Sequence, residues 1–307
     1  MEKTKRIIFM GTPDYATIIF KKLLEENYNI VALFTQPDKP VGRKQLLTPP
    51  HIKQYLDEQD FDLPIYQPVT LKDENIVKII KELNPDMIIV AAYGQILPKN
   101  ILDIAPCINL HASLLPKYRG ASPIQQALLN GDKYSGVTAM YMEEGLDSGD
   151  ILGLKYIEIT QDMVVSELFD NLSTIAATLT IEILERFEIT LAKKQNDSLV
   201  SHCKKIDKKD GLVSFDNANL FYNKYKAYKS WPDLYLESKL KIKECSLYNS
   251  ENKYKSGQIL EINKGNIIVG CEKGSILITK VQPASKKEMS VVDYIRGKRL
   301  EIGDNLS

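Results

Sequence analysis

The first 35 residues alternate between two short apolar runs and one helical repeat, and this alternation constrains the fold more than any other feature. Residues 6–10 (RIIFM) form an apolar run that stops at Gly11, and residues 29–35 (NIVALFT) form a second run rich in β-forming side chains. Between them, residues 15–26 place isoleucine and leucine at helical spacing. A strand, a helix and a strand in this order predict a parallel α/β sheet.

Later segments extend the same pattern to about residue 190. Residues 87–92 (MIIVAA) are apolar throughout, which predicts a strand covered on both faces. Further strands are expected at 107–110 and 137–142, and further helices at 76–83, 122–129 and 164–187. We therefore expect residues 1–190 to form an α/β domain, with an open, mostly parallel, Rossmann-like sheet and helices on both of its faces.

The composition of the sequence changes after residue 190. Residues 191–209 are polar and rich in lysine, and we expect a linker there. Residues 210–307 contain short strand candidates separated by Lys, Asn and Gly, which are typical of a small β-barrel, here an OB-like one. These strands are expected at 212–215, 234–236, 242–247, 257–262, 266–271 and 275–280, with one helix at 220–228.

The formal net charge of zero hides an uneven distribution. Residues 1–190 carry 18 Lys and Arg against 26 Asp and Glu, whereas residues 191–307 carry 22 against 14. The two parts therefore have net charges of −8 and +8. Such asymmetry is a pointer to a nucleic-acid or membrane partner, although two solvated surfaces of opposite sign would give the same numbers.

Several classes of protein and site are disfavoured by the sequence. No apolar run approaches the ~20 residues that span a bilayer, and the apolar residues 7–10 are too few for a signal peptide, so we expect a cytoplasmic protein. No two of the four cysteines lie within three residues of each other, so we predict no zinc-binding pair and no metal. The turn at 10–13 (MGTP) lacks the G-x-G-x-x-G fingerprint, which argues against NAD binding.

Residues 107–151 contain the densest chemical signal in the chain. Asn109 and His111 are two residues apart on a predicted strand, so their side chains point to the same face. There they would project into the crevice where open α/β sheets bind ligands. Asp147 lies in a turn between two glycines after the next strand and could approach them. Each residue taken alone is more often a turn or sheet-end residue, but together they indicate a site.

An amide, an imidazole and a carboxylate suit the direct transfer of an acyl group to an amine, without a nucleophilic side chain or a metal. Asn109 and His111 can donate hydrogen bonds to a developing oxyanion. Asp147 can assist removal of a proton from the attacking amine, directly or through water. The irregular apolar loop 113–116 (SLLP) could hold a flat heterocycle by main-chain hydrogen bonds and apolar contact.

The stretch 109–124 (NLHASLLPKYRGASPI) resembles the signature of the 10-formyltetrahydrofolate-dependent formyltransferases, and 145–150 (GLDSGD) is similar to their second motif. The resemblance implies that residues 1–190 are a formyltransferase catalytic domain with 10-formyltetrahydrofolate as co-substrate. It implies that the catalytic residues are Asn109, His111 and Asp147. It also implies folate-binding residues in two loops, namely Ser113, Leu114, Leu115, Pro116, Gln95, Ile96 and Leu97.

Within the family, the similarity is greatest to members that formylate the methionine of initiator tRNA. The segments that carry it are IFMGTPD at 8–14, TQPDKPVGR at 35–43, VAAYGQILP at 90–98 and, more loosely, SWP at 230–232 and VQPASKK at 281–287. The resemblance implies that loop 35–43 inserts into the tRNA acceptor stem and that residues 210–307 form a tRNA-binding domain.

The residues of this loop fit that role. Five prolines and glycines lie within residues 35–50, and we expect no regular element there. A basic loop inside an otherwise acidic half is suited to a phosphate or base contact. Its basic residues, and our candidates for tRNA binding, are Lys39, Arg43 and Lys44, with Arg43 as the expected main contact.

Two alternative functions stay open. A formyltransferase acting on a sugar-nucleotide amine would share the catalytic half, and an RNA-binding protein could retain the fold without the chemistry. The basic loop and basic second half favour tRNA over a sugar nucleotide, and the intact set of Asn109, His111 and Asp147 favours an enzyme. We therefore expect initiator methionyl-tRNA and 10-formyltetrahydrofolate as partners, no membrane contact, and a monomer.

Overall fold

The computed structural model describes residues 2–42, 44–59 and 61–306, which divide into two compact units. The first unit is made of Met1–Pro123, Tyr134–Glu158 and Phe169–Cys203, and the second of Ile124–Lys133, Ile159–Leu168 and Lys204–Ser307. Two short segments from the first half of the sequence thus belong to the second unit. The domain boundaries expected at residues 190 and 209 stay a prediction.

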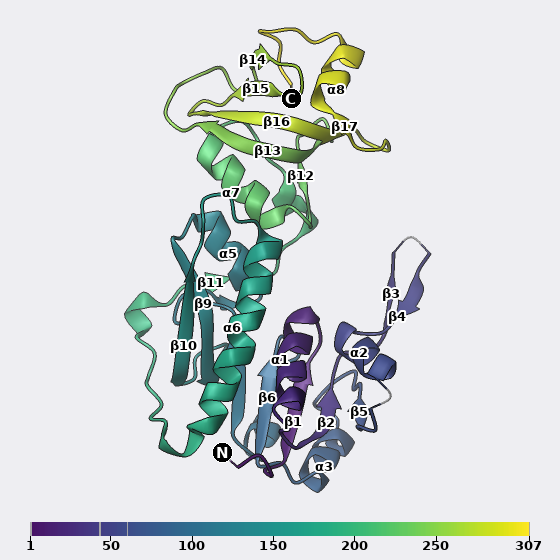
Figure 1. The fold of residues 1–307 in the computed structure, drawn as a ribbon, viewed down its shortest axis with the longest axis vertical. Helices are drawn as coiled ribbons and strands as arrows, with labels where there is room; N and C mark the ends of the chain where they lie inside the picture. Colours follow the sequence, from purple (N-terminus) through teal and green to yellow (C-terminus); the bar gives the residue numbers. More distant parts are fainter. Residues whose placement is uncertain (1, 43, 60, 307) are drawn as a thin grey trace. The chain divides into compact units, whose positions relative to one another are not determined.

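A seven-stranded sheet forms the centre of the first unit, with the strand order β10-β9-β7-β6-β1-β2-β5 (Figure 1). Strands β7, β6, β1, β2 and β5 are parallel, whereas β9 and β10 form antiparallel pairs at one edge. The mostly parallel α/β sheet is therefore confirmed. The strands are β1 (Ile7–Gly11), β2 (Ile30–Phe34), β5 (Ile65–Tyr66), β6 (Met87–Ala91), β7 (Cys107–His111), β9 (Tyr134–Tyr141) and β10 (Ile151–Glu158).

The helices that accompany these strands in the chain are α1 (Asp14–Glu25), α2 (His51–Gln59), α3 (Glu74–Glu82), α4 (Lys99–Leu102), α5 (Pro123–Asn130) and α6 (Val165–Glu185). Both faces of the sheet are covered, because alternate side chains of the fully buried strand β1 point to opposite sides. Phe9 packs edge-on against Phe20 of α1, with ring centroids 5.3 Å apart. Ile8 and Met10 instead join a core cluster with residues of α3 and α4.

The expectation that residues 35–50 contain no regular element is wrong. Strands β3 (Lys39–Val41) and β4 (Leu46–Thr48) pair antiparallel in a hairpin (Figure 1). Pro40 is tolerated within β3 because a two-stranded ribbon has open edges at which a backbone donor is not required. Gly42, with φ of +72°, supplies the left-handed conformation that follows β3.

The segment expected to be a linker is partly anchored to the first unit. Ile151 and Lys193 exchange two backbone hydrogen bonds of 2.8 and 2.9 Å. Strand β11 (His202–Cys203) then pairs in parallel with β8 (Arg119–Gly120). Because these contacts fix both ends of residues 193–203, this stretch has a defined path along the unit that contains the candidate site.

The second unit contains an antiparallel sheet whose strands pair along the path β12-β13-β16-β15-β14, with β17 also paired to β16. The smaller carboxyl-terminal antiparallel β domain is therefore confirmed. Its helices are α7 (Ala218–Tyr228) and α8 (Val291–Lys298). Its strands are β12 (Leu234–Tyr235), β13 (Lys241–Asn249), β14 (Ile259–Ile262), β15 (Ile267–Gly270), β16 (Ser275–Gln282) and β17 (Met289–Ser290).

The prediction of a strand at residues 212–215 is wrong. Only Leu212 pairs with another strand residue, in an isolated bridge to Tyr235. The chain then turns, because the Ser214 hydroxyl donates to the Asp216 carboxylate and the Asn217 side chain accepts from the first backbone N–H groups of α7. Local capping of a helix has overridden the β propensity of the apolar residues before it.

Among the described residues, no helix is both long and apolar enough to cross a membrane. The same residues contain no group of three or more His, Cys, Asp or Glu arranged to hold a metal ion. The four cysteines, Cys107, Cys203, Cys245 and Cys271, are buried and free.

Candidate active site

Strand β7 positions the first two candidate residues. Asn109 and His111 are separated by one residue on this strand, so both side chains project from the same face. Strand β7 lies between parallel β6 and antiparallel β9, where the sheet changes its connectivity. His111 ends the strand and is only 6% exposed. The sequence thus places an amide and an imidazole side by side at the carboxyl end of an interior strand.

Asp147 reaches this pair from the turn between β9 and β10. Its Oδ1 accepts from Asn109 Nδ2 at 3.4 Å, and its Oδ2 lies 3.6 Å from His111 Nδ1. The Gly120 backbone N–H donates to Oδ2 at 2.8 Å, which is the shortest of these contacts. Asp147 itself has φ of +49°, a left-handed conformation that is strained for a residue with a side chain. The structure therefore brings the three sequence-predicted residues together.

Gly120 is required at its position by a close approach of two backbones. A Cβ added there would collide with the carbonyl oxygen of Cys203, and its φ is +119°. The pairing of β8 with β11 thus fixes the position of Gly120, whose N–H donates to the Asp147 carboxylate. This donor to the site was not predicted from the sequence, because the pairing joins residues about 80 positions apart.

The ring of His111 has a defined orientation. Its Nε2 lies 2.9 Å from the Tyr118 carbonyl oxygen, which can only accept a hydrogen bond. Nε2 therefore carries a hydrogen, and Nδ1 is the nitrogen that faces Asp147. In the neutral ring Nδ1 is an acceptor, and it becomes a donor only in the imidazolium form.

A cysteine lies close to these residues but does not supply a nucleophile. Cys203 Sγ accepts from the Ser122 N–H at 3.3 Å and donates to the Tyr118 carbonyl oxygen at 3.4 Å. Burial raises the pKa of the Cys203 thiol, so the thiol stays protonated near neutral pH. The site therefore supports direct transfer rather than a covalent cysteine intermediate.

The loop expected to bind folate through residues 113–116 is held from behind by Thr138. The Thr138 hydroxyl donates to the Ser113 carbonyl at 2.7 Å and accepts from the Leu115 N–H at 3.1 Å. Ser113 and Leu115 are buried, whereas Leu114 and Pro116 are half-buried. Leu114 and Pro116 each keep part of their surface exposed, although Leu114 Cδ2 also packs against Gly136 of β9. Ser113 and Leu115 fix the loop backbone.

The second expected folate loop, residues 95–97, also has side chains that fix its backbone and one that is exposed. The Gln95 amide accepts from the Leu71 N–H and donates to the Pro68 carbonyl, so it joins two loops rather than pointing free. Leu97 is 2% exposed and packs in the core. Ile96 between them is 81% exposed. Of the three, Ile96 has the side chain that is available to a ligand.

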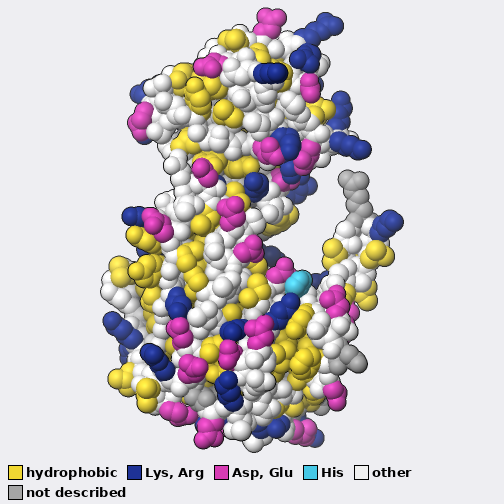
Figure 2. All heavy atoms as spheres, viewed as in Figure 1, with side chains coloured by type: hydrophobic (Ala, Val, Ile, Leu, Met, Phe, Trp, Pro, Cys, Tyr) yellow, Lys and Arg dark blue, Asp and Glu magenta, His cyan; other side chains and the backbone are white. Residues whose placement is uncertain are grey.

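The hairpin β3–β4 presents the residues expected to contact tRNA. Lys39 and Lys44 are exposed, while Arg43 lies outside the described residues. Val41, Leu46 and Leu47 are 55%, 64% and 69% exposed, which is unusual for large apolar side chains. Figure 2 shows yellow apolar and dark-blue cationic side chains together on this hairpin.

The root of the hairpin is fixed by a polar cluster. Asp38 accepts from Lys53 Nζ at 3.1 Å through each of its oxygens and from Gln67 Nε2 at 2.7 Å. Gln67 also donates to the Gln36 carbonyl at 2.9 Å. These bonds, of which the Gln67 hydrogen bond is the largest cause, lower the pKa of Asp38. The hairpin therefore extends from an anchored base.

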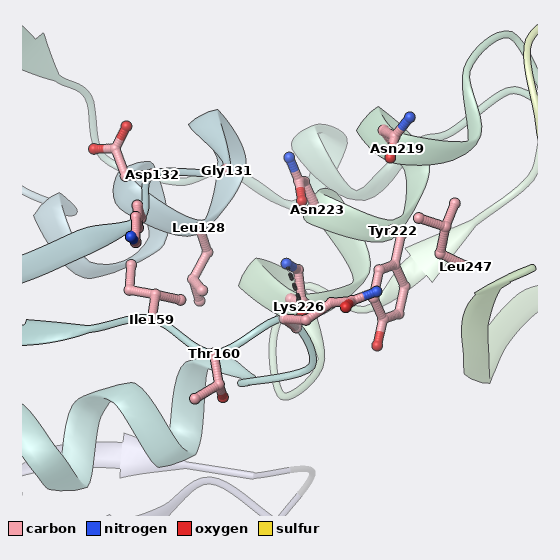
Figure 3. Close-up of a pocket in the computed structure, with 12 residues that line it drawn as sticks. Leu128, Gly131, Asp132, Ile159, Thr160, Asn219, Tyr222, Asn223, Lys226 and Leu247 are labelled. Atoms are coloured by element: carbon pink, nitrogen blue, oxygen red, sulfur yellow. Dashed lines mark hydrogen bonds between the residues drawn. The ribbon is translucent and has the colours of Figure 1, made fainter. Parts of the chain in front are cut away.

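A cavity of about 380 Å³ lies within the second unit and is lined by none of these residues (Figure 3). Asn223 and Lys226 from α7 face Leu128 and Ile159 across it (Figure 3). Lys226 Nζ donates to the Gln161 carbonyl at 3.0 Å, and burial lowers its pKa. The lysine is therefore already engaged in holding the segments of this unit together.

Comparisons with known proteins agree with this geometry. Residues 5–184 match the family described as formyl transferase, and residues 205–299 match the formyl transferase C-terminal domain. The methionyl-tRNA formyltransferase of a Nitratiruptor species is 56% identical over 299 residues, which cover 97% of this chain and 99% of that protein. The methionyl-tRNA formyltransferase of Sulfurimonas denitrificans is 56% identical over 98% of this chain and 100% of that protein.

Solved structures show the same fold at lower identity. The N-formyltransferase from Helicobacter canadensis, in complex with folinic acid and dTDP-3-aminofucose, has a TM-score of 0.69 and 18% identity, over 91% of this chain and 100% of that one. HypX from Aquifex aeolicus, in complex with tetrahydrofolic acid, has a TM-score of 0.64 and 14% identity, over 96% of this chain and 47% of that one. From its two family matches and its full-length relatives, the chain belongs to the formyl transferase family, among the methionyl-tRNA formyltransferases.

Proposed function

We propose that the chain transfers the formyl group of 10-formyltetrahydrofolate to the amino group of methionine on initiator methionyl-tRNA, which yields the N-formylmethionyl-tRNA used to start translation. The observation that carries the proposal is the cluster of Asn109, His111 and Asp147 at the end of β7. It occurs in a chain that is 56% identical to methionyl-tRNA formyltransferases over nearly its whole length.

The transfer balances without an oxidant, a reductant or a metal. The methionine nitrogen forms a bond to the formyl carbon, and the bond from that carbon to N10 of the folate breaks. The amine loses one proton and N10 gains one. Between these events the formyl oxygen carries negative charge, and this is the charge that fixed donors in the site stabilise.

Asn109 is the donor best placed for that oxyanion. Its amide group has two N–H bonds, of which one points to Asp147 Oδ1. Within the described part of the chain, no acceptor is bonded to the other, which can bind the substrate oxygen. His111 adds a second donor only through Nδ1 of the imidazolium, because its Nε2 is committed to Tyr118. Asp147 accepts the amine proton, directly or through one water.

The folate would lie between the two loops that carry Leu114, Pro116 and Ile96. These are the side chains that the loops leave partly exposed (Leu114, Pro116) or exposed (Ile96), and a pterin ring needs apolar contact on its faces. Ser113, Leu115, Gln95 and Leu97 support the pocket by holding the loop backbones. Their side chains are buried or already hydrogen bonded.

The tRNA would bind to the hairpin through Lys39, Arg43 and Lys44, and to the basic domain at residues 210–307. Exposed apolar residues next to cationic ones suit a nucleic acid, whose bases stack and whose phosphates attract lysine and arginine. Arg43→Ala should raise the KM for tRNA and leave the KM for the folate donor unchanged. A matched rise in both would point to a folding defect instead of a lost contact.

We further propose three domains or segments, a monomeric state and a cytoplasmic location. Residues 1–190 would be the catalytic domain, 191–209 the linker, and 210–307 the tRNA-binding domain. Matches at 5–184 and 205–299 support a division into two parts between residues 184 and 205. Light scattering on a size-exclusion column should give the mass of one 34.8-kDa chain, and a dimer mass would refute the monomer.

A substrate comparison tests the proposed function. The purified chain is incubated with 10-formyltetrahydrofolate and one of three acceptors: charged initiator tRNA, charged elongator methionyl-tRNA or a dTDP-linked amino sugar. We expect formylation of the initiator tRNA and none of the sugar. Formylation of the sugar alone would establish the alternative enzyme, and binding of tRNA without product would favour the RNA-binding protein.

A further inference from the structure

One side chain from the segment expected to be a linker enters the candidate active site. Gln195 Nε2 donates to the carbonyl oxygens of Asp147 and Gly149, at 2.9 and 2.8 Å. Its Oε1 accepts from Nε and Nη2 of Arg119, at 3.0 and 2.8 Å. Both hydrogens and both lone pairs of the amide are thus used, so the orientation of this side chain is fixed.

These bonds close a ring of contacts around Asp147. Arg119 is 8% exposed and precedes Gly120, whose N–H donates to the Asp147 carboxylate. Gln195 therefore holds the main chain of Asp147 on one side and the strand β8 that supplies the Gly120 donor on the other. The carboxylate and its donor are fixed relative to each other through a single amide.

Backbone hydrogen bonds on both sides of Gln195 fix the segment that carries its side chain. Lys193 is bonded to Ile151 on one side. On the other side, the Ser201 carbonyl accepts from the Arg119 N–H at 2.9 Å and the Ser201 hydroxyl accepts from the Tyr118 N–H at 3.0 Å. Tyr118 is also the residue whose carbonyl orients His111. The same segment thus supports both titratable members of the site.

Asp147 needs such support because its backbone conformation is strained. A non-glycine residue at φ of +49° persists only where surrounding bonds determine it. The turn that carries Asp147 is otherwise open to solvent, with Glu144, Gly145 and Leu146 exposed at the surface. Without the two bonds from Gln195, the turn could relax and carry the carboxylate away from Asn109 and His111.

We propose that Gln195 is a positioning residue for formyl transfer, which holds the Asp147 turn so that the carboxylate stays within reach of Asn109 and His111. This inference rests on the proposed function. A purely structural brace would change stability alone, whereas a positioning residue changes kcat more than KM, because its effect is on the reacting geometry.

Two substitutions at Gln195 separate these roles. Gln195→Glu keeps an acceptor for Arg119 but turns a carboxylate oxygen toward two carbonyls, and Gln195→Leu removes all four bonds. We expect kcat to fall about 10- to 100-fold in both, with the KM for each substrate changed by less than about twofold. Gln54→Leu, at an exposed glutamine on α2, is the matched control and should keep the wild-type kcat.

A double-mutant cycle with Asp147→Asn shows whether Gln195 acts through Asp147. If it does, Gln195→Leu should change kcat by less than about twofold once Asp147 is already replaced, because coupled residues are not additive. A full additional loss in that background would overturn the proposal. So would a wild-type kcat in Gln195→Leu alone.

Controls keep this result separate from folding and from the proposed function. The thermal midpoint of each variant is measured first, and if Gln195→Leu does not fold, Gln195→Glu takes its place in the cycle with the same criteria. If the wild-type chain makes no formylmethionyl-tRNA, the proposed function is wrong. If the wild type is active and both Gln195 variants match it in kcat, only the positioning inference is wrong.

Discussion

At the scale of single residues, the chemistry of the site follows from spacing, but its orientation does not. Asn109 and His111 were predicted to share a face because they are two apart on a strand. The ring nitrogen of His111 that faces the site is set by the hydrogen bond from Nε2 to the Tyr118 carbonyl. Tyr118 lies in a turn and has φ of +61°. That turn conformation has no sequence signature at a tyrosine, so the tautomer could not be predicted.

Asn109→Asp is a nearly isosteric change that removes both N–H donors and places a second carboxylate beside Asp147. We expect kcat to fall by about 100-fold or more, since loss of one oxyanion donor has an effect of this size. Steady-state kinetics with saturating folate donor and tRNA would measure it. Asn100→Asp, at an exposed position on α4, is the control. An equal loss of kcat there would show that the effect does not come from a lost oxyanion donor.

At the scale of elements, most strands and helices of the parallel sheet were predictable because each is a continuous apolar run or a helical repeat. Strands β5 and β10 and helices α2 and α4 were not predicted. Strand β5 has two residues and α4 has four, β10 is a partly exposed strand at the edge of the sheet, and α2 is mostly polar. The hairpin β3–β4 was missed because three paired residues on each side give too short a pattern to see beneath the prolines.

Thr138→Val tests whether the 113–116 loop is held by β9. The change keeps the shape of the side chain but leaves the Leu115 N–H and the Ser113 carbonyl without a partner. We expect the free energy of unfolding to fall by about 1–3 kcal/mol, and the KM for the folate donor to rise more than the KM for tRNA. Thr178→Val on the exposed face of α6 is the matched control. A rise in the KM for tRNA alone would contradict the folate assignment.

Asp38→Asn tests the anchored root of the hairpin. It removes the ion pair with Lys53, so trypsin should cleave the hairpin faster and the KM for tRNA should rise, with the KM for the folate donor unchanged. Asp57→Asn on the exposed side of α2 is the control. Protection of the wild-type hairpin equal to that of Asp38→Asn would refute the anchor.

The pH dependence of this root has a defined sign. The pKa of Asp38 is lowered in the folded protein, so its contribution is complete above the ordinary aspartate pKa of ~3.9 and is lost as pH falls through the lowered value. Trypsin protection of the hairpin should therefore stay constant from about pH 8 down to about pH 5. A loss of protection within that window would show that another group controls the hairpin.

At the scale of the whole molecule, the zero net charge divides into −8 and +8, and the α/β and antiparallel β parts were both predictable from patterning. The assignment of residues 124–133 and 159–168 to the second unit was not, because it depends on contacts distant in sequence. The same holds for Gln195, whose partners Arg119 and Asp147 lie 76 and 48 positions away. A polar stretch gives no local signal of such contacts.

The uneven charge predicts that tRNA binding weakens with salt although the chain is neutral overall. Each neutralised phosphate contributes about −0.9 to the slope of log K against log salt. We expect the Kd for tRNA to rise at least about tenfold between ~50 and ~200 mM KCl, with the affinity for the folate donor less affected. A salt-independent Kd for tRNA would show that the basic half does not hold phosphates.

Formyl transfer to methionyl-tRNA is proposed to occur at Asn109, His111 and Asp147. The most direct test is the single-turnover rate of formylmethionyl-tRNA formation, measured in parallel for the wild type, Asp147→Asn and the exposed control Glu144→Gln in the same turn. We expect wild-type rates for Glu144→Gln and a loss of about 100-fold or more for Asp147→Asn, with tRNA affinity retained. An unchanged rate in Asp147→Asn, or no formylmethionine from the folded wild-type chain, would contradict this proposal.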